Sequence, residues 1–160
     1  MSTATLEEEK VVERERPLAS YGALMGTFSA VFGGAIAIAA AQGRLPSRPS
    51  AMDIALVAVA GHKVSRLVAK DKVTLPLRAP FTETRLEDGE LVDEPVGTGM
   101  QKAVGQLLTC PKCVGQWACA SFVVGMIYSP RATRAVASVF ASDAISDFLH
   151  VAYRAADRRA

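Results

Sequence analysis

The sequence predicts an all-α integral membrane protein, and three observations lead to that prediction. Half of the 160 residues are hydrophobic and only 21% are charged, a balance shifted toward membrane proteins. One uncharged run of 27 residues extends from Pro17 to Gly43, and another of 18 residues extends from Cys113 to Pro130. Two further segments are mostly apolar but carry a few charges. We therefore expect about four transmembrane or membrane-embedded helices, with the lipid bilayer as the first partner.

The first helix is expected over residues 18–42. An α-helix rises about 1.5 Å per residue, so about 20 residues cross a hydrocarbon core about 30 Å thick, and this segment is long enough to span it. Cleavage as a signal peptide is disfavoured because 16 residues precede the run and five of them are glutamates, whereas a secretory leader begins with a short basic region. We expect residues 1–16 to form a disordered or solvated tail.

Small side chains recur along one face of this first helix. They stand three or four residues apart, and small residues at that spacing let two helices approach closely in lipid. This small-residue stripe comprises Gly22, Gly26, Ala30, Gly33, Ala37 and Ala41. Unless glycine and alanine recur here only because they are common in the chain, the stripe is a contact face for a second copy or for another membrane protein, through Gly22, Gly26, Ala30 and Gly33.

The second helix is expected over residues 51–70. Ser50 followed by Asp53 is typical of a capped helix N-terminus. Further along, His62, Arg66 and Lys70 stand four residues apart and share a face. A basic residue near the bilayer centre costs about 2.5 to 3.5 kcal/mol on insertion scales. This helix therefore needs support from its neighbours, or it lies at the membrane surface.

The rest of the chain is expected to contain one long loop and two more helices. Residues 71–102 hold three prolines, three glycines and mixed charge, which predicts an aqueous loop. Helices are expected over residues 110–129 and 133–154, closing a membrane domain of residues 17–156. The last helix carries Asp143, Asp147 and His150 on one face.

The distribution of basic residues predicts the orientation in the membrane. If all four helices cross, fourteen Lys and Arg residues lie on the side of the tail, the loop and the C-terminus, and four lie on the other side. Cytoplasmic loops carry the excess of basic residues in membrane proteins. We therefore expect a multi-pass protein of the cell membrane, with both termini and the 71–102 loop in the cytoplasm.

Cys110-Pro111-Lys112-Cys113 is the sharpest local motif. Proline is favoured at the first helical position, so both sulfurs lie near a helix N-terminus, where the helix dipole and Lys112 favour thiolates. A structural role, thiol redox chemistry and metal binding in an oligomer all fit this pattern. No strands flank the motif as in a thioredoxin-like fold, and a metal needs ligands beyond Cys110 and Cys113. We expect the pair not to cycle as a disulfide, because the predicted orientation places it on the reducing side.

Charged residues within the helices form the other candidate site. Ionisable side chains in a membrane span normally face the bundle interior and pair with one another. The carboxylates of Asp143 and Asp147 are therefore expected to face one of the cations of the second helix, which are Lys63, Arg66 and His62. A structural ion pair that helps the 51–70 helix to insert is the favoured interpretation, and a proton or ion path is the alternative.

Several motifs in combination resemble a known family. They are Arg66-Leu67-Val68, Lys70-Asp71, the segment from Pro76 to Phe81, and the run from Leu107 to Trp117 with the cysteine pair. Together they resemble domain-of-unknown-function family 1360, a family of small bacterial membrane proteins, over roughly residues 52–155. The resemblance implies a multi-span bacterial protein that shares the basic segment and the cysteine motif, and it implies no activity. The candidate residues among these motifs are Arg66, Lys70, Asp71, Pro80 and Trp117.

The functional expectation is a small, non-catalytic membrane component or assembly partner. The sequence shows no complete catalytic constellation and indicates no cofactor, and a net charge of +2 without a continuous basic face gives no reason to expect nucleic acid. Two alternatives stay open. One is a membrane-embedded thiol redox or metal-binding protein that uses Cys110 and Cys113, and the other is a small channel or transporter subunit built on Arg66, Asp143 and Asp147.

Overall fold

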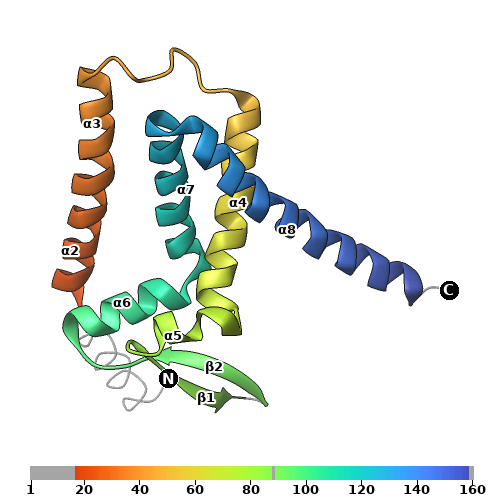
Figure 1. Ribbon diagram of the computed structural model, residues 1–160. Coiled ribbons are helices and arrows are strands. Elements are labelled where there is room, and N and C mark those ends of the chain that lie inside the picture. The colour runs from red at the N-terminus through yellow and green to blue at the C-terminus, as the bar shows by residue number, and fades with distance from the viewer. Residues whose placement is uncertain (1–16, 88, 159–160) are drawn as a thin grey trace, which may run out of the picture.

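Helices dominate the computed structural model, which describes residues 17–87 and 89–158. The tail expected over residues 1–16 lies outside this part of the chain. In Figure 1 the chain runs up α2 and α3, down α4, up α7 and obliquely down α8, so that successive long elements alternate in direction. One end of the bundle is covered by α6 and a small sheet, and the other end carries only connecting turns.

The first long helix contains one wide turn. It consists of α2 (Leu18–Phe28), a π-helical turn (Ser29–Gly33) and α3 (Gly34–Ala41). The wide turn lies where the helix meets α7, because the rings of Phe28 and Phe32 both pack edge-on against Trp117, with centroids 5.1 and 5.7 Å away. Such aromatic contacts attach the helix to the bundle. In its most apolar stretch of 18 residues only 6% is buried, so most of the apolar surface of this helix faces outward.

Small residues let α4 (Ala51–Lys70) and α7 (Pro111–Tyr128) approach closely. A Cβ atom added at Gly61 would lie 2.3 Å from the sulfur of Cys119, and one added at Gly115 would already touch Ser65. The buried apolar residues are mainly alanines, among them Ala60, and no large side chain in the described chain is completely buried. The core is therefore a seam of small residues, which is how helices pack in lipid.

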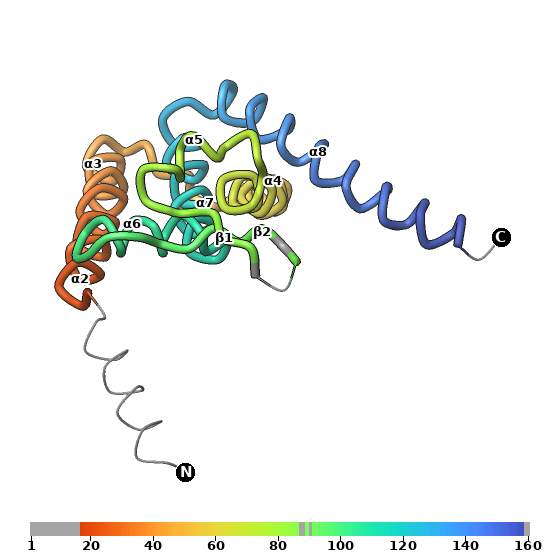
Figure 2. Tube along the Cα trace, turned by 90° about the horizontal axis from the view of Figure 1, so that it is seen from below, coloured from red at the N-terminus to blue at the C-terminus, as the bar shows by residue number. Residues whose placement is uncertain are grey.

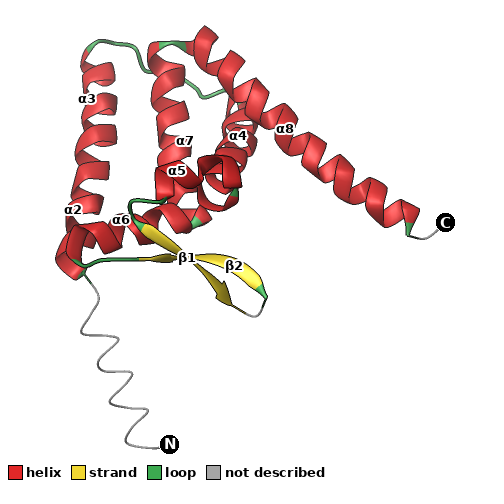
Figure 3. Cartoon of the chain, turned by 60° about the horizontal axis from the view of Figure 1, so that its bottom comes forward, coloured by secondary structure: helices red, strands yellow, loops and turns green. Residues whose placement is uncertain are grey.

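The segment expected to be a loop, residues 71–102, is largely ordered, and this corrects the all-α prediction. It forms a short sheet and three helical pieces: a 3₁₀ turn (Lys72–Thr74), α5 (Leu75–Arg78), β1 (Thr82–Glu87), β2 (Glu90–Pro95) and the start of α6 (Gly99–Thr109). The two strands are antiparallel, and they pair Thr82 with Pro95 and Glu87 with Glu90 (Figure 3). The sequence Asp88-Gly89 joins them, and such a dipeptide between strands is a hairpin signal.

A sharp bend separates α6 from α7. The two helices meet at 83°, and Cys110 between them has an extended backbone, with φ −99° and ψ 103°. Proline at position 111 favours this conformation for the residue before it. As a result α6 lies across the end of the bundle while α7 runs along it (Figure 1).

The last helix, α8 (Pro130–Asp157), starts on the bundle and then leaves it (Figure 2). Its first half packs on α7 through the rings of Phe122 and Phe140, and its second half exposes large apolar side chains such as Phe148 and Val151. Within residues 17–87 and 89–158, only Leu18–Ala41 and Pro130–Asp157 are single helices long and apolar enough to cross a membrane. The bent pair α6 and α7 adds a third if it forms one span, and α4 is not among them.

Candidate functional site

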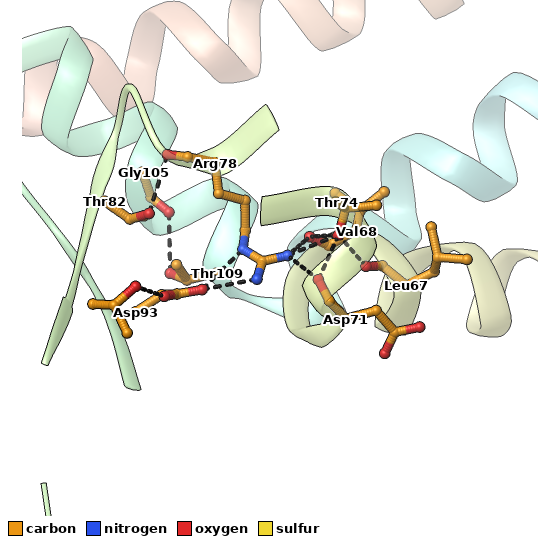
Figure 4. A network of polar contacts seen from close by, with 10 residues as sticks. Leu67, Val68, Asp71, Thr74, Arg78, Thr82, Asp93, Gly105 and Thr109 are labelled. Atoms are coloured by element: carbon orange, nitrogen blue, oxygen red, sulfur yellow. Dashed lines mark hydrogen bonds and ion pairs between the residues drawn. The ribbon is translucent and has the colours of Figure 1, made fainter. Parts of the chain in front are cut away.

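Arg78 is the centre of a closed polar site where α4, α5 and the hairpin meet (Figure 4). Its side chain is only 2% exposed. Nη1 donates hydrogen bonds to the carbonyl oxygens of Val68 and Asp71 at 2.6 and 3.1 Å, and to the hydroxyl of Thr74 at 2.8 Å. The end of a helix leaves its last carbonyl groups without partners. The guanidinium therefore caps the end of α4.

The other edge of the same guanidinium holds the hairpin. Nε and Nη2 donate to one carboxylate oxygen of Asp93 at 3.1 and 2.8 Å, and the hydroxyl of Thr84 donates to the other at 2.7 Å. Burial opposes the negative charge of Asp93, but these hydrogen bonds and the nearby positive charge outweigh it and hold the pKa of Asp93 below its usual value. Thr82 completes the site by donating to the carbonyl of Arg78 at 3.0 Å.

The residues predicted from the sequence in this region have backbone roles or lie on its surface. Asp71 accepts from Arg78 through its carbonyl, and the carbonyl of Pro80 accepts from Gln101 Nε2 at 3.0 Å. Lys70 is exposed at the end of α4. Sequence reasoning did not find Asp93, because no local pattern links it to Arg78. Because each side-chain nitrogen of Arg78 has a hydrogen-bond partner, we interpret the Arg78 site as structural.

The two cysteines of the motif lie close together at the start of α7. Cys110 is the N-cap, its sulfur accepts from the backbone N–H of Cys113 at 3.3 Å, and the two sulfur atoms are 2.7 Å apart. Among the described residues no group of three His, Cys, Asp or Glu side chains could hold a metal ion. A metal on this pair therefore needs ligands from another molecule.

A mainly apolar pocket of about 640 Å³ opens beside the cysteine pair, between α2, α6 and α7. Trp117, a residue named from the sequence motifs, lies in its wall together with Phe28. Tyr21 donates a hydrogen bond to Gln106 Oε1 and so joins α2 to α6 across it. Both Cys110 and Cys113 line the pocket, so a ligand bound there would lie beside the thiols.

Lys63 makes the ion pairs that join α4 to α8. Its ammonium lies 3.0 Å from Asp143 and 2.6 Å from Asp147, and its side chain is 11% exposed while the two carboxylates are about half exposed. Of the three cations considered from the sequence, the structure therefore brings Lys63 to the aspartates. Arg66 and His62 lie nearby, in the wall of a cleft between the same helices.

Asp53 has a different partner from the one that the sequence suggested. The N-cap residue of α4 is Ser50, but its side chain makes no capping hydrogen bond. The carboxylate of Asp53 instead accepts two hydrogen bonds of 2.8 Å from Arg134 on α8. A bidentate pair of this kind fixes the relative orientation of two helices. It is a second bridge between α4 and α8, toward the opposite end from the Arg78 site.

The small-residue stripe of the first helix is exposed in the part of the chain that the structure describes. Each of its members is exposed, and a Cβ atom added at Gly22, Gly26 or Gly33 would meet nothing within 4 Å. The side of the helix that does pack is the one that carries Phe28 and Phe32. The stripe is therefore open to contact with lipid or with another protein.

Comparisons with known proteins agree with the family resemblance. A family described as "Protein of unknown function (DUF1360)" matches residues 56–153. The matched segment starts within α4 and ends within α8, and it includes the Arg78 site, the cysteine pair and Lys63 with its two aspartates. The chain is also similar to the sporulation protein YjcA of Bacillus subtilis (strain 168), with 36% identity over 78 residues. That match covers 46% of this chain and 65% of the relative's length. No solved structure matches the chain.

Proposed function

Since this chain belongs to the DUF1360 family, we propose that it is a multi-pass bacterial membrane protein that works as a non-catalytic membrane component or assembly partner. The observation that carries the proposal is the outward direction of its apolar surface. Only 6% and 17% of the most apolar windows of Leu18–Ala41 and Pro130–Asp157 are buried, and residues such as Phe148 are two-thirds exposed. Apolar surface of this extent needs lipid or protein to cover it.

The proposed orientation places both termini, the hairpin and α6 in the cytoplasm. It is supported by the excess of Lys and Arg on that side. The alternating direction of the long elements also supports it, because the start of α2, the end of α4 and the start of α7 lie at the end of the bundle that carries the hairpin (Figure 1). In this arrangement α4 crosses the membrane although it carries Lys63, because Asp143 and Asp147 on α8 compensate the charge of that lysine.

Fractionation and reporter fusions test this proposal. The protein should stay in the membrane pellet after alkaline carbonate extraction. Reporters fused after Ala160 and inserted between Gly97 and Gly99 should both report the cytoplasm, and one inserted at Pro46 should report the outside. Release by carbonate would remove the membrane assignment, whereas an outside signal at Ala160 or between Gly97 and Gly99 would remove the four-crossing topology alone.

We propose the small-residue stripe as the contact face for a second copy or another membrane protein. The open space around Gly22, Gly26 and Gly33 among the described residues supports this, because a close helix contact in lipid needs small residues on the approaching face. Gly26→Leu should abolish the crosslink between copies that a cysteine at position 22 forms, while Ala23→Leu on a neighbouring face should leave it. Unchanged crosslinking in Gly26→Leu would exclude this face from the contact.

A second candidate function is that of a thiol redox protein. The distance of 2.7 Å between the sulfur atoms of Cys110 and Cys113 favours it. A disulfide needs a separation of about 2.05 Å, which a small side-chain movement would supply. Against it stands the proposed cytoplasmic location, which keeps thiols reduced. Alkylation trapping in cells separates the two: reduced thiols agree with a non-catalytic role, and a substantial oxidised fraction, or a mixed disulfide trapped in Cys113→Ser, would establish the redox candidate.

A further inference from the structure

A cleft of about 580 Å³ lies between α4 and the departing half of α8. It is separate from the cysteine pocket and from the Arg78 site, and of its lining only the ion pair of Lys63 with Asp147 has a role in the proposals above. Its walls combine basic side chains with an apolar surface: His62, Lys63, Arg66, Ala144, Asp147, Phe148, His150, Val151 and Arg154.

The two helices bring matching polar pairs to this cleft. On α4, His62 and Arg66 stand four residues apart, and on α8, His150 and Arg154 stand four residues apart. Residues at that spacing share one face of a helix. Because all four line the same cleft, two imidazoles and two guanidiniums are directed into one space from opposite walls.

Neither of these two guanidiniums is held in an ion pair by the described part of the chain, although the charge of Arg66 acts on Asp147 from a distance. Lys63 holds both nearby carboxylates, Asp143 and Asp147, at 3.0 and 2.6 Å. Between residues 17 and 158, with position 88 excepted, Arg66 and Arg154 have no ion pair, and both are exposed. The cleft therefore has spare positive charge with hydrogen-bond donors, and it holds no further carboxylate to receive them.

A phosphate group is the anion that fits such a set of donors. A guanidinium presents paired N–H groups that match two phosphate oxygens, and two of them on facing helices can hold one phosphate from both sides. The wall between them is apolar: Phe148 and Val151 are each about two-thirds exposed beside the basic residues. A free phosphate would leave this apolar wall wet, whereas a lipid would cover it with an acyl chain.

We propose that the cleft between α4 and α8 binds the phosphate of an anionic phospholipid, with Arg66 and Arg154 as its main donors and Phe148 and Val151 along its chain. This rests on the proposed membrane location. Basic pockets between helices on the cytoplasmic side are known sites for anionic headgroups. The site also explains how α4 can carry Arg66, because the lipid supplies the ion-pair partner that residues 17–87 and 89–158 do not.

Lipid retention in nanodiscs tests the proposal. The full chain is incorporated in discs of equal phosphatidylglycerol and phosphatidylethanolamine, and the lipids that remain bound are identified by native mass spectrometry. The wild type should retain phosphatidylglycerol preferentially, and Arg66→Gln and Arg154→Gln should each lower the ratio of the two bound lipids about fivefold. The matched control is Arg48→Gln with Arg131→Gln, which removes two exposed positive charges away from the cleft. Elution volume and thermal unfolding confirm that each variant is folded.

Each result decides one point. Loss of the preference in the cleft variants but not in the control establishes the site. A preference that survives Arg66→Gln with Arg154→Gln, or that falls equally in the control, would overturn it. Binding of inorganic phosphate to the detergent-solubilised protein that depends on these arginines, without any preference for phosphatidylglycerol, would overturn the lipid assignment in favour of a free phosphate. A chain released by carbonate would instead contradict the membrane location on which the inference rests.

Discussion

Arg66 and Arg78 stand twelve residues apart in the sequence, but they have opposite surroundings in the structure. Arg78 is 2% exposed, and its guanidinium bonds to backbone carbonyls, Thr74 and Asp93. Arg66 is exposed in an open cleft and has no ion pair within the described part of the chain. A basic residue with every donor satisfied supports the fold, whereas one with free donors is available for a ligand. The comparison therefore separates a charge that holds the fold together from one that is exposed for the ligand proposed above.

The largest effect is expected from Arg78→Ala. It removes the cap of α4 and leaves the Asp93 carboxylate, only 16% exposed, without its cation. Breaking a buried pair by removing one partner costs about 3 to 5 kcal/mol. Chemical unfolding in detergent should therefore show a severe loss of stability. The matched control is Arg85→Ala, because the side chain of Arg85 is 61% exposed. This substitution should change the free energy of unfolding by less than about 1 kcal/mol. Similar losses in both variants would contradict the structural role of Arg78.

The next effect concerns how the hairpin sits on α6. A Cβ atom added at Gly105 would lie 2.5 Å from the carbonyl oxygen of Phe81 and 3.1 Å from Pro95. Gly105→Ala should therefore displace the hairpin and cost about 1 to 3 kcal/mol, as overpacking does. Gly26→Ala, where nothing lies within 4 Å, should leave the monomer unchanged or stabilise it by less than about 1 kcal/mol. Thermal unfolding of the two variants measures the difference, and equal effects would mean that α6 and the hairpin do not pack as described.

A double-mutant cycle between Lys63 and Asp147 should show a smaller effect. Lys63→Gln leaves Asp143 and Asp147 near each other without a cation, so it should lower the yield of folded protein more than Asp147→Asn, after which Asp143 still holds the lysine. Lys63→Gln with Asp147→Asn should recover part of the loss. The same cycle with Arg66→Gln should show only weak coupling to Asp147→Asn, because Arg66 acts on that carboxylate from a distance and makes no ion pair with it. Strong coupling between Arg66→Gln and Asp147→Asn would instead mean that Arg66, and not Lys63, is the main partner of Asp147.

The smallest effect is the acid sensitivity of the hairpin. Because the folded chain lowers the pKa of Asp93, the ionised carboxylate stabilises the fold fully above its ordinary pKa of about 3.9, and this contribution is lost as the pH falls toward the lowered value. Asp93→Asn should therefore be less stable than the wild type near neutral pH, and the gap should narrow below about pH 4. Unfolding measured across this range checks the sign, and a gap that widens in acid would contradict it.

The helices of this fold are predictable from the sequence, because long uncharged runs and residues that start or end a helix depend only on neighbours in the sequence. Pro111 after Cys110 and the run from Leu18 to Ala41 carry their signal within a few residues. Pro80, Pro95 and several glycines predict a loop where the structure has a hairpin, and Asp88-Gly89 is the local signal that indicates the hairpin. The number of crossings and the orientation stay predictions, because both depend on how α4 and α8 meet the lipid.

The candidate sites show the same division. Spacing of four residues identified the helix faces that carry Asp143, Asp147 and Arg66, because that spacing is a property of one helix. Which cation reaches the aspartates depends on how α4 and α8 cross, and the structure selects Lys63. The contact between Arg78 and Asp93 depends on a hairpin that lies in the predicted loop. Contacts within one element are thus predictable from the sequence, and contacts between elements are not.

The π-helical turn of the first helix sets the angular phase between its two halves. Below the turn, Tyr21 reaches Gln106 on α6, and above it, Tyr128 of α7 donates to the carbonyl of Ala35 at 2.8 Å. A wide turn accommodates one more residue than an α-helical turn, and each residue of an α-helix advances the azimuth by about 100°. Because the wide turn takes up that extra residue, deleting one residue from Ser29–Gly33 would restore a regular α-helical turn and keep both anchors in phase, whereas straightening the turn without a deletion would rotate one of them out of reach.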